Sequence, residues 1–243
     1  MIEVLAESGF DFVIIDQEHA AKGVETIENM IRAANVYDLP ALVRVASNEE
    51  KAILAVIESG AAGIVVPFIE SRDDVDRASR ALFFPPKGNR GVCTQTRAAR
   101  HGALRSRFLD HVTRENDRLV LMGLIESLPG ARNIGEILTH PAGLDALMVG
   151  RSDLAAQLGK PGQAKDPEVM KATVDVLSAC TAGDFPETRT AMVIYQPEEV
   201  DTWKRHGSTI FIGASEVGLI LDGLSTWRGA TRDRSSPEDR SSS

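Results

Sequence analysis

Seven short, continuous apolar runs, separated by amphipathic helical segments, constrain the fold of this chain more than any other feature. Each run lacks the polar alternation of a half-exposed strand, and this is typical of strands buried on both faces of a parallel sheet. Between the runs, Ser71 and the pair Asp166-Pro167 are capping signals for helix starts. The repeated order of strand then helix predicts parallel βα units. The runs cover residues 12–15, 41–43, 64–66, 119–122, 146–149, 191–194 and 210–212.

The length of the chain, 243 residues, suits one (β/α)8 barrel, which takes about 250 residues. A short amphipathic helix with Ile2, Leu5 and Ala6 opens the chain before the first apolar run. We therefore predict a TIM-type (β/α)8 barrel that lacks its first strand, as a single domain over residues 1–227. A doubly wound open sheet is the competing architecture, but neither GxGxxG nor GxxxxGK[ST] occurs. Residues 228–243 are rich in Ser, Arg and Asp, and we predict a disordered tail there.

Charge and cysteine content exclude several classes of function. The net charge of −8 repels nucleic acid and anionic membranes, and no apolar stretch reaches the ~18 residues needed to cross a bilayer. We therefore expect neither a nucleic-acid nor a membrane partner. The two cysteines, Cys93 and Cys180, lie far apart, which excludes a zinc-finger-type site and favours a reduced, cytoplasmic location.

Charged residues directly follow several of the predicted strands, where a parallel barrel gathers its catalytic groups. Glu126 and Asp153 follow two neighbouring strands, and such a pair of carboxylates can hold one hard divalent cation. The alternative is that Ser127 and Asp153 cap the helices that begin there. The turn that contains Gly150, Ser152 and Asp153 precedes a helix, whose free N–H groups attract anions.

Three further residues follow the first two strands. A carboxylate such as Asp16 near the imidazole of His19 is the arrangement that a general base needs, although a structural histidine is more common. Arg44 can bind a carboxylate or a developing enolate, or it can simply pair with Asp16. None of the seven lysines lies in an apolar run, so carbonyl chemistry here would rely on a metal rather than on a Schiff base. The proline-rich stretch 85–91 fits an active-site loop and a plain surface loop equally well.

Five segments of the chain occur in the order of a known enzyme family: GFDFVIIDQEHA (9–20), LVRV (42–45), PPKGNRG (85–91), GLIES (123–127) and VGRSDL (149–154). Together they resemble the HpcH/HpaI-type metal-dependent class II pyruvate aldolases, from about residue 3 to residue 225. This resemblance implies a barrel of the phosphoenolpyruvate/pyruvate kind. It also implies a lyase that reversibly cleaves a 4-hydroxy-2-oxo acid into pyruvate and an aldehyde, through a metal-stabilised pyruvate enolate.

The resemblance also implies roles for individual residues. Glu126 and Asp153 match the ligands of a divalent metal, Mg2+, Mn2+ or Co2+. His19 matches the catalytic base, with Asp16 as a nearby orienting acid, and Arg44 matches the arginine that binds the keto oxygen. The backbone of Gly150, Ser152 and Asp153 matches the pyruvate carboxylate site. Glu58 stands where the family has an aspartate that reaches the histidine of an adjacent subunit. The implied assembly is a homo-hexamer, a dimer of trimers, with the helix over residues 215–227 exchanged between chains.

The chain departs from the family pattern at Gln17, Leu124, Arg151 and Ser152. Leu124 removes a polar group from the pocket floor, and Arg151 is expected to add positive charge beside the anion site. These departures leave open which aldehyde and which 2-oxo acid are used. Two other readings also stay open: related enolate chemistry, as in oxaloacetate decarboxylation or an acyl-CoA lyase, and a non-catalytic incomplete barrel.

Overall fold

Seven parallel strands form one sheet in sequence order, β1 to β7. The computed structural model describes residues 1–140, 143–182, 188–213 and 215–235. All seven predicted strands are confirmed. Consecutive order excludes the doubly wound alternative, because the strand order of that fold reverses at a switch point. The strands are Val13–Asp16 (β1), Ala41–Arg44 (β2), Gly63–Val66 (β3), Val120–Ile125 (β4), Ala146–Val149 (β5), Arg189–Val193 (β6) and Ile210–Ile212 (β7).

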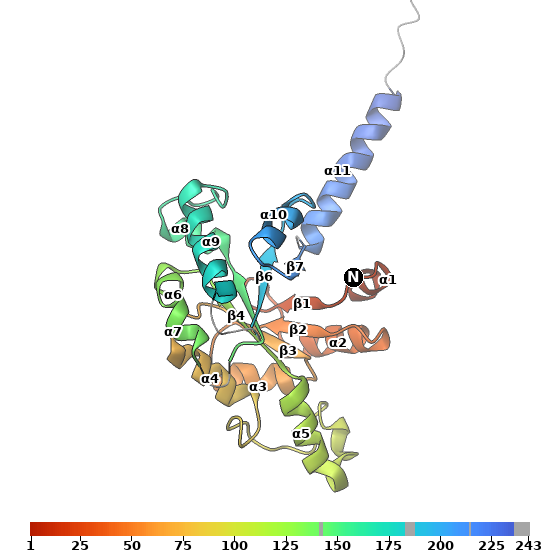
Figure 1. The fold of residues 1–243 in the computed structure, drawn as a ribbon. Helices are drawn as coiled ribbons and strands as arrows, with labels where there is room; N and C mark the ends of the chain where they lie inside the picture. Colours follow the sequence, from red (N-terminus) through yellow and green to blue (C-terminus); the bar gives the residue numbers. More distant parts are fainter. Residues whose placement is uncertain (141–142, 183–187, 214, 236–243) are drawn as a thin grey trace, which may run out of the picture.

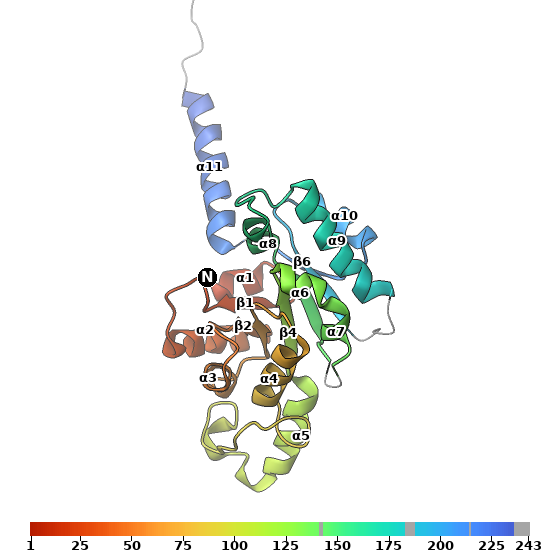
Figure 2. The ribbon, with the colours of Figure 1, turned by 90° about the vertical axis from the view of Figure 1, so that its left-hand side faces the viewer.

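The sheet curls into an incomplete barrel with helices on its outer side (Figures 1 and 2). Among the described residues, β1 pairs only with β2 and β7 pairs only with β6. The predicted barrel that lacks one strand is therefore confirmed. The helices are Ile2–Glu7 (α1), Val24–Val36 (α2), Glu50–Glu58 (α3), Arg72–Leu82 (α4), Phe108–Arg118 (α5), Leu128–Arg132 (α6), Ile134–Leu138 (α7), Arg151–Gln157 (α8), Pro167–Ala182 (α9), Glu199–Arg205 (α10) and Glu216–Ser235 (α11), with short 3-10 turns at Arg100–Gly102 and Arg105–Arg107.

Both predicted capping signals are confirmed. The Ser71 Oγ accepts a hydrogen bond from the backbone N–H of Asp74 at 3.3 Å, which satisfies a free donor at the start of α4. Asp166 Oδ1 accepts from the N–H of Glu168 at 2.9 Å, and Pro167 is the first residue of α9. These local signals fix where two of the outer helices begin.

Alternation along the strands separates two apolar clusters. Val13, Ile15 and Val43 pack outward against the helices, whereas Leu42, Leu124 and Met148 belong to a second cluster inside the curl of the sheet. Side chains along a strand alternate between its two faces. A residue that follows a member of the second cluster by two positions therefore lies on the same inner face, at the carboxyl edge of the sheet. Four residues have this position: Asp16, Arg44, Glu126 and Gly150.

In the long excursion between β3 and β4, helix α5 and the segment before it lie at the opposite end of the sheet from α8 and α11 (Figure 2). Arg90 is 4% exposed, its guanidinium lies 4.3 Å from the centre of the Phe84 ring, and Glu115 is 3.7 Å away. The N–H of Ala98 donates to the carbonyl of Glu58, just before β3 begins. These contacts attach residues 85–98 to the amino-terminal edge, which favours a structural loop over an active-site loop.

Helix α11 differs from the expected end of the domain. It continues past residue 227 to Ser235, and residues 228–235 contain no proline that would break the helix. Its apolar residues are uncovered, with Leu224 60% and Trp227 71% exposed, and the helix projects away from the sheet (Figure 1). The rest of the predicted tail, 236–243, lies outside the described residues. No described helix is both long and apolar enough to cross a membrane.

Candidate active site

The first two strands bring Asp16 and Arg44 together at the carboxyl edge of the sheet. The two residues are partners in the parallel register of β1 and β2. Arg44 donates from Nε to Asp16 Oδ1 at 2.8 Å and from Nη2 to Asp16 Oδ2 at 2.7 Å. Burial acts to raise the pKa of Asp16, but the hydrogen bonds and charge of Arg44 outweigh it, so this pKa lies below its ordinary value. The predicted structural pairing of Arg44 therefore exists, and it fixes the guanidinium plane at the site.

Glu18 is a further acid at this edge, and our sequence interpretation gave it no role. Its Oε2 lies 3.3 Å from Arg44 Nη1 and 3.8 Å from His19 Nε2. The same oxygen is buried and accepts no hydrogen bond within the described part of the chain. Burial raises the pKa of Glu18, and the charges of Asp16 and Asp153 add to that rise. A usable signal was present in the sequence, because Glu18 follows Asp16 by two positions.

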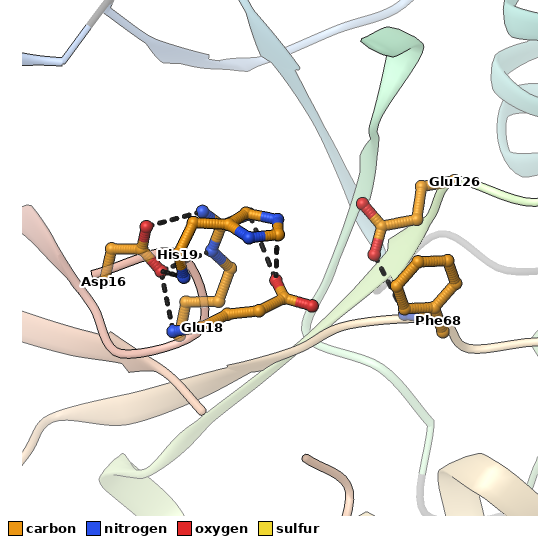
Figure 3. A network of polar contacts seen from close by, with 6 residues as sticks. Asp16, Glu18, His19, Phe68 and Glu126 are labelled. Atoms are coloured by element: carbon orange, nitrogen blue, oxygen red, sulfur yellow. Dashed lines mark hydrogen bonds and ion pairs between the residues drawn. The ribbon is translucent and has the colours of Figure 1, made fainter. Parts of the chain in front are cut away.

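His19 lies beside this cluster with its side chain 62% exposed (Figure 3). Asp16 accepts a hydrogen bond from the backbone N–H of His19 at 3.4 Å, and another from that of Glu18 at 3.0 Å. Asp16 thus shapes the turn that carries the imidazole, while Glu18 is the acid next to the ring. In this arrangement the histidine is accessible to a substrate.

Glu126 follows β4 at the same edge of the sheet, and Figure 3 shows it across from Asp16, Glu18 and His19. The residue is 2% exposed, and its Oε1 accepts a hydrogen bond from the N–H of Phe68 at 3.1 Å. Burial raises its pKa to about 7, the charges of Glu18 and Asp153 add to the rise, and Phe68 and Arg44 oppose it. These couplings show that Glu18, Glu126 and Asp153 share one electrostatic environment.

The helix-cap alternative holds for Ser127 but not for Asp153. The Ser127 Oγ accepts from the N–H of Gly130 at 3.1 Å at the start of α6. Gly150 occupies the N-cap of α8, and no side chain caps this helix. Asp153 is the third residue of α8 and is half-buried, which leaves its carboxylate available to the site.

The absence of a side chain at Gly150 leaves space for the side chain of Glu126. A Cβ at position 150 would lie 2.7 Å from the Glu126 Cβ and 2.8 Å from its Oε2. We expect Gly150→Ala to displace the carboxylate, to lower stability by about 1–3 kcal/mol and to reduce activity at least tenfold. Gly135→Ala in α7 is the matched control, because nothing lies within 4 Å of its added Cβ. Chemical denaturation and steady-state kinetics of both variants check this; equal activity would show that the contact has no catalytic importance.

The raised pKa of Glu126 predicts a pH dependence of stability in the metal-free protein. A carboxyl group with a folded pKa of about 7 and an ordinary value of 4.5 binds its proton more tightly when folded. Its contribution to stability is therefore fully present below pH 4.5 and is lost as the pH rises through 7. Relative to Glu126→Gln, the wild type should lose about 1–3 kcal/mol of unfolding free energy between pH 4.5 and pH 8. Urea denaturation at several pH values measures this difference, and a constant difference would contradict it.

The donor set fits a hard divalent cation. Glu126 and Asp153 offer carboxylate oxygens, and their mutual repulsion is of the kind that a bound cation relieves. Within the described ranges, no three His, Cys, Asp or Glu residues form a group able to hold a metal. Magnesium commonly takes only one or two protein carboxylates and completes its coordination with water and substrate oxygens.

Other predicted site residues lie elsewhere or point elsewhere. Glu58 is the last residue of α3, next to the amino-terminal edge, so it does not join His19 within one chain. Ser152 contacts the hydroxyl of Tyr195 at 3.3 Å. Arg151 is 3% exposed and donates to Glu199 Oε2 at 2.9 Å and to the Val193 carbonyl at 2.8 Å. The positive charge of Arg151, which we expected beside the turn of Gly150, Ser152 and Asp153, is therefore paired with Glu199 instead.

Comparison with known proteins places the chain in a family. The family model described as HpcH/HpaI aldolase/citrate lyase matches residues 1–221. The chain belongs to this family. This HpcH/HpaI family member is 30% identical over 218 residues to a 5-keto-4-deoxy-D-glucarate aldolase of Shigella dysenteriae serotype 1 (strain Sd197), covering 90% of this chain and 82% of the relative. It is 33% identical to a hydroxypyruvate/pyruvate aldolase of Sagittula stellata (strain ATCC 700073 / DSM 11524 / E-37), covering 71% of this chain and 66% of that protein.

Solved structures give the same assignment. An HpcH/HpaI family protein from Burkholderia cenocepacia J2315 superposes with a TM-score of 0.87 at 29% identity, covering 95% of this chain and 89% of that one. The citrate synthase SbnG superposes with a TM-score of 0.85 at 28% identity, covering 98% and 90%. The HpcH/HpaI protein described here is therefore an enzyme of an aldolase family, which favours the enzymatic interpretation over a non-catalytic barrel.

Proposed function

We propose that this enzyme is a divalent-metal-dependent aldolase that reversibly cleaves a 4-hydroxy-2-oxo acid into pyruvate and an aldehyde. One observation carries the proposal: a guanidinium held by Asp16 and Glu18 shares the carboxyl edge with the buried acid Glu126, the half-buried Asp153 and an accessible imidazole. An enolate requires positive charge at its oxygen and a group that accepts the proton released elsewhere.

Glu126 and Asp153 would hold the cation, with Mg2+, Mn2+ and Co2+ as the ions that suit the site. When bound, the ion supplies Lewis-acid polarisation of the substrate oxygens. The backbone of Gly150, Ser152 and Asp153 faces the carboxylate end of the 2-oxo acid in this proposal.

In this proposal His19 transfers the proton and Arg44 stabilises the enolate. His19 takes the proton from the 4-hydroxyl group, the C3–C4 bond breaks, and its electron pair moves into the enolate of pyruvate. Arg44 faces the enolate oxygen through the N–H groups that Asp16 and Glu18 leave free, since a guanidinium has five donors. His19 then returns the proton to C3, which completes pyruvate. Proton transfer by a placed imidazole of this kind contributes about 10²–10⁴-fold to the rate.

The proposal includes an assembly of several copies. The uncovered apolar residues of α11 suit exchange between chains, and Glu58 would then approach His19 of a neighbouring copy in a homo-hexamer. The cysteines Cys93 and Cys180 are unpaired in the described chain, which supports a cytoplasmic setting.

The test is pyruvate release from a panel of 4-hydroxy-2-oxo acids, before and after treatment with a chelator. We expect activity that chelation removes and that Mg2+, Mn2+ or Co2+ restores. Lys22→Gln is the control for Schiff-base chemistry, because Lys22 Nζ lies 3.4 Å from the carbonyl oxygen of Asp16. Full activity in excess chelator, or loss of activity in Lys22→Gln with trapping by borohydride, would contradict the proposal.

The likeness to the citrate synthase SbnG makes related enolate chemistry the second candidate. Oxaloacetate and a malyl-type thioester therefore belong in the same assay. Faster turnover of either substrate than of every aldol substrate would favour this candidate.

A further inference from the structure

A basic hollow of about 550 Å3 lies at the amino-terminal edge of the sheet, on the opposite side from the candidate active site. Pro40, Ala41 and Ala62, at the starts of β2 and β3, form part of its wall. Helix α5 and the segment that precedes it close the other side, and α5 lies far from α8 and α11 in Figure 2. The volume is in the range of small-molecule pockets.

The lining of this hollow is unusual for an acidic protein. The chain carries a net charge of −8, yet the lining holds Arg97, Arg100, Arg114 and Arg118 with Glu115 as its one acidic residue. Glu115 is already engaged, because Arg118 donates to its two oxygens at 2.6 and 2.9 Å. Three guanidinium charges are therefore left without a carboxylate from the lining.

The position of Arg97 is fixed by the backbone around it. Its Nη1 donates to the carbonyl of Ser59 at 2.8 Å. A Cβ on Gly60 would lie 2.5 Å from that nitrogen, and Gly60 has a φ of +93°, a backbone conformation that favours glycine. This arrangement orders one arginine at the hollow before any ligand arrives.

Arg100 and Arg114 are exposed, and in the described ranges neither guanidinium makes a hydrogen bond or an ion pair. Arg100 and His101 both have a φ of 52°, which is uncommon for residues with a Cβ and often marks a functional position. Like charges gathered in this way repel one another unless an anion lies among them.

We propose that this hollow binds a phosphoryl anion, either a pyrophosphate or the phosphate group of a small metabolite. Guanidinium groups bind phosphate oxygens in fork geometry. Arg100 and Arg114 have free N–H donors, and Arg97 has others besides the one that bonds Ser59. Pyrophosphate offers these donors more acceptor oxygens than a dicarboxylate such as malonate does. The site is separate from the proposed aldolase chemistry and does not depend on it.

The test is calorimetric titration of the full chain with pyrophosphate, with malonate as the carboxylate comparator. We expect one site per chain, affinity that falls with added salt, and weaker binding of malonate. The double variant Arg100→Ser/Arg114→Ser should bind pyrophosphate at least tenfold more weakly. Arg132→Ser, an exposed arginine of α6, should bind like the wild type. The variant Arg100→Lys/Arg114→Lys keeps the charge and removes the fork, and we expect an intermediate affinity.

Several outcomes would overturn this proposal. They are absence of saturable binding, equal affinity in the double variant and the wild type, or tighter binding of malonate than of pyrophosphate. An altered oligomeric state of the double variant with unchanged affinity would also overturn it, because the face would then be a subunit contact.

Discussion

Replacing Glu126 with glutamine is expected to lower kcat for aldol cleavage by at least about a thousandfold, while the fold is preserved. Glutamine has nearly the same shape, and its carbonyl oxygen can still accept the hydrogen bond from Phe68. The substitution removes the negative charge that the proposed cation requires, and electrostatic stabilisation by a bound metal is worth several kcal/mol. Steady-state kinetics at saturating Mg2+ or Mn2+ measure the effect.

The matched control is Glu136→Gln, which changes the same functional group on the exposed surface of α7. Its activity should equal that of the wild type. The metal-free Glu126→Gln protein should be at least as stable as the wild type at pH 8, because it no longer carries a buried carboxylate. Activity within tenfold of the wild type would show that Glu126 does not hold a catalytic cation.

The second large effect is expected for His19. His19→Asn should lower kcat/KM by about 10²–10⁴-fold, since the variant has no imidazole to accept the substrate proton. The side chain of His19 is 62% exposed, so thermal stability should hardly change. His206→Asn is the control for loss of an imidazole away from the site.

Glu18→Gln should have a smaller effect than His19→Asn, because Asp16 alone still holds Arg44 through two hydrogen bonds. A His19→Asn variant whose kcat/KM stays within about tenfold of the wild type would assign the proton transfer to another group. The comparison of these two variants therefore separates the proposed base from the acid beside it.

Most of the fold could be predicted from apolar patterning. The runs around Ile14, Leu42 and Leu121 are short and continuous, and all of them become parallel strands. Side chains alternate between the two faces of a strand, and this explains why Asp16, Arg44 and Glu126 meet. Each of them follows, by two positions, an apolar residue of the cluster inside the curl of the sheet. Local sequence therefore predicted both the strands and the edge at which the charged residues gather.

Contacts between distant segments could not be predicted in this way. Nothing near Arg151 in the sequence indicates that Glu199 would neutralise it, because that partner lies on α10. Glu18 received no role because its importance comes from its distances to Arg44 and His19, which a pattern does not contain. The stretch 85–91 fitted two interpretations until the contacts of Arg90 with Phe84 and Glu115 placed it at the amino-terminal edge.

The most direct test of the central proposal is calorimetric titration of the metal-free protein with Mn2+ in the presence of pyruvate, for the wild type and Asp153→Asn. If Glu126, just after β4, and Asp153 of α8 share one cation, the wild type should bind one Mn2+ per chain. The variant should bind Mn2+ at least about a hundredfold more weakly, because it has lost one of the two charged ligands. Equal Mn2+ affinity in the two proteins, or no Mn2+ binding by the wild type, would contradict it.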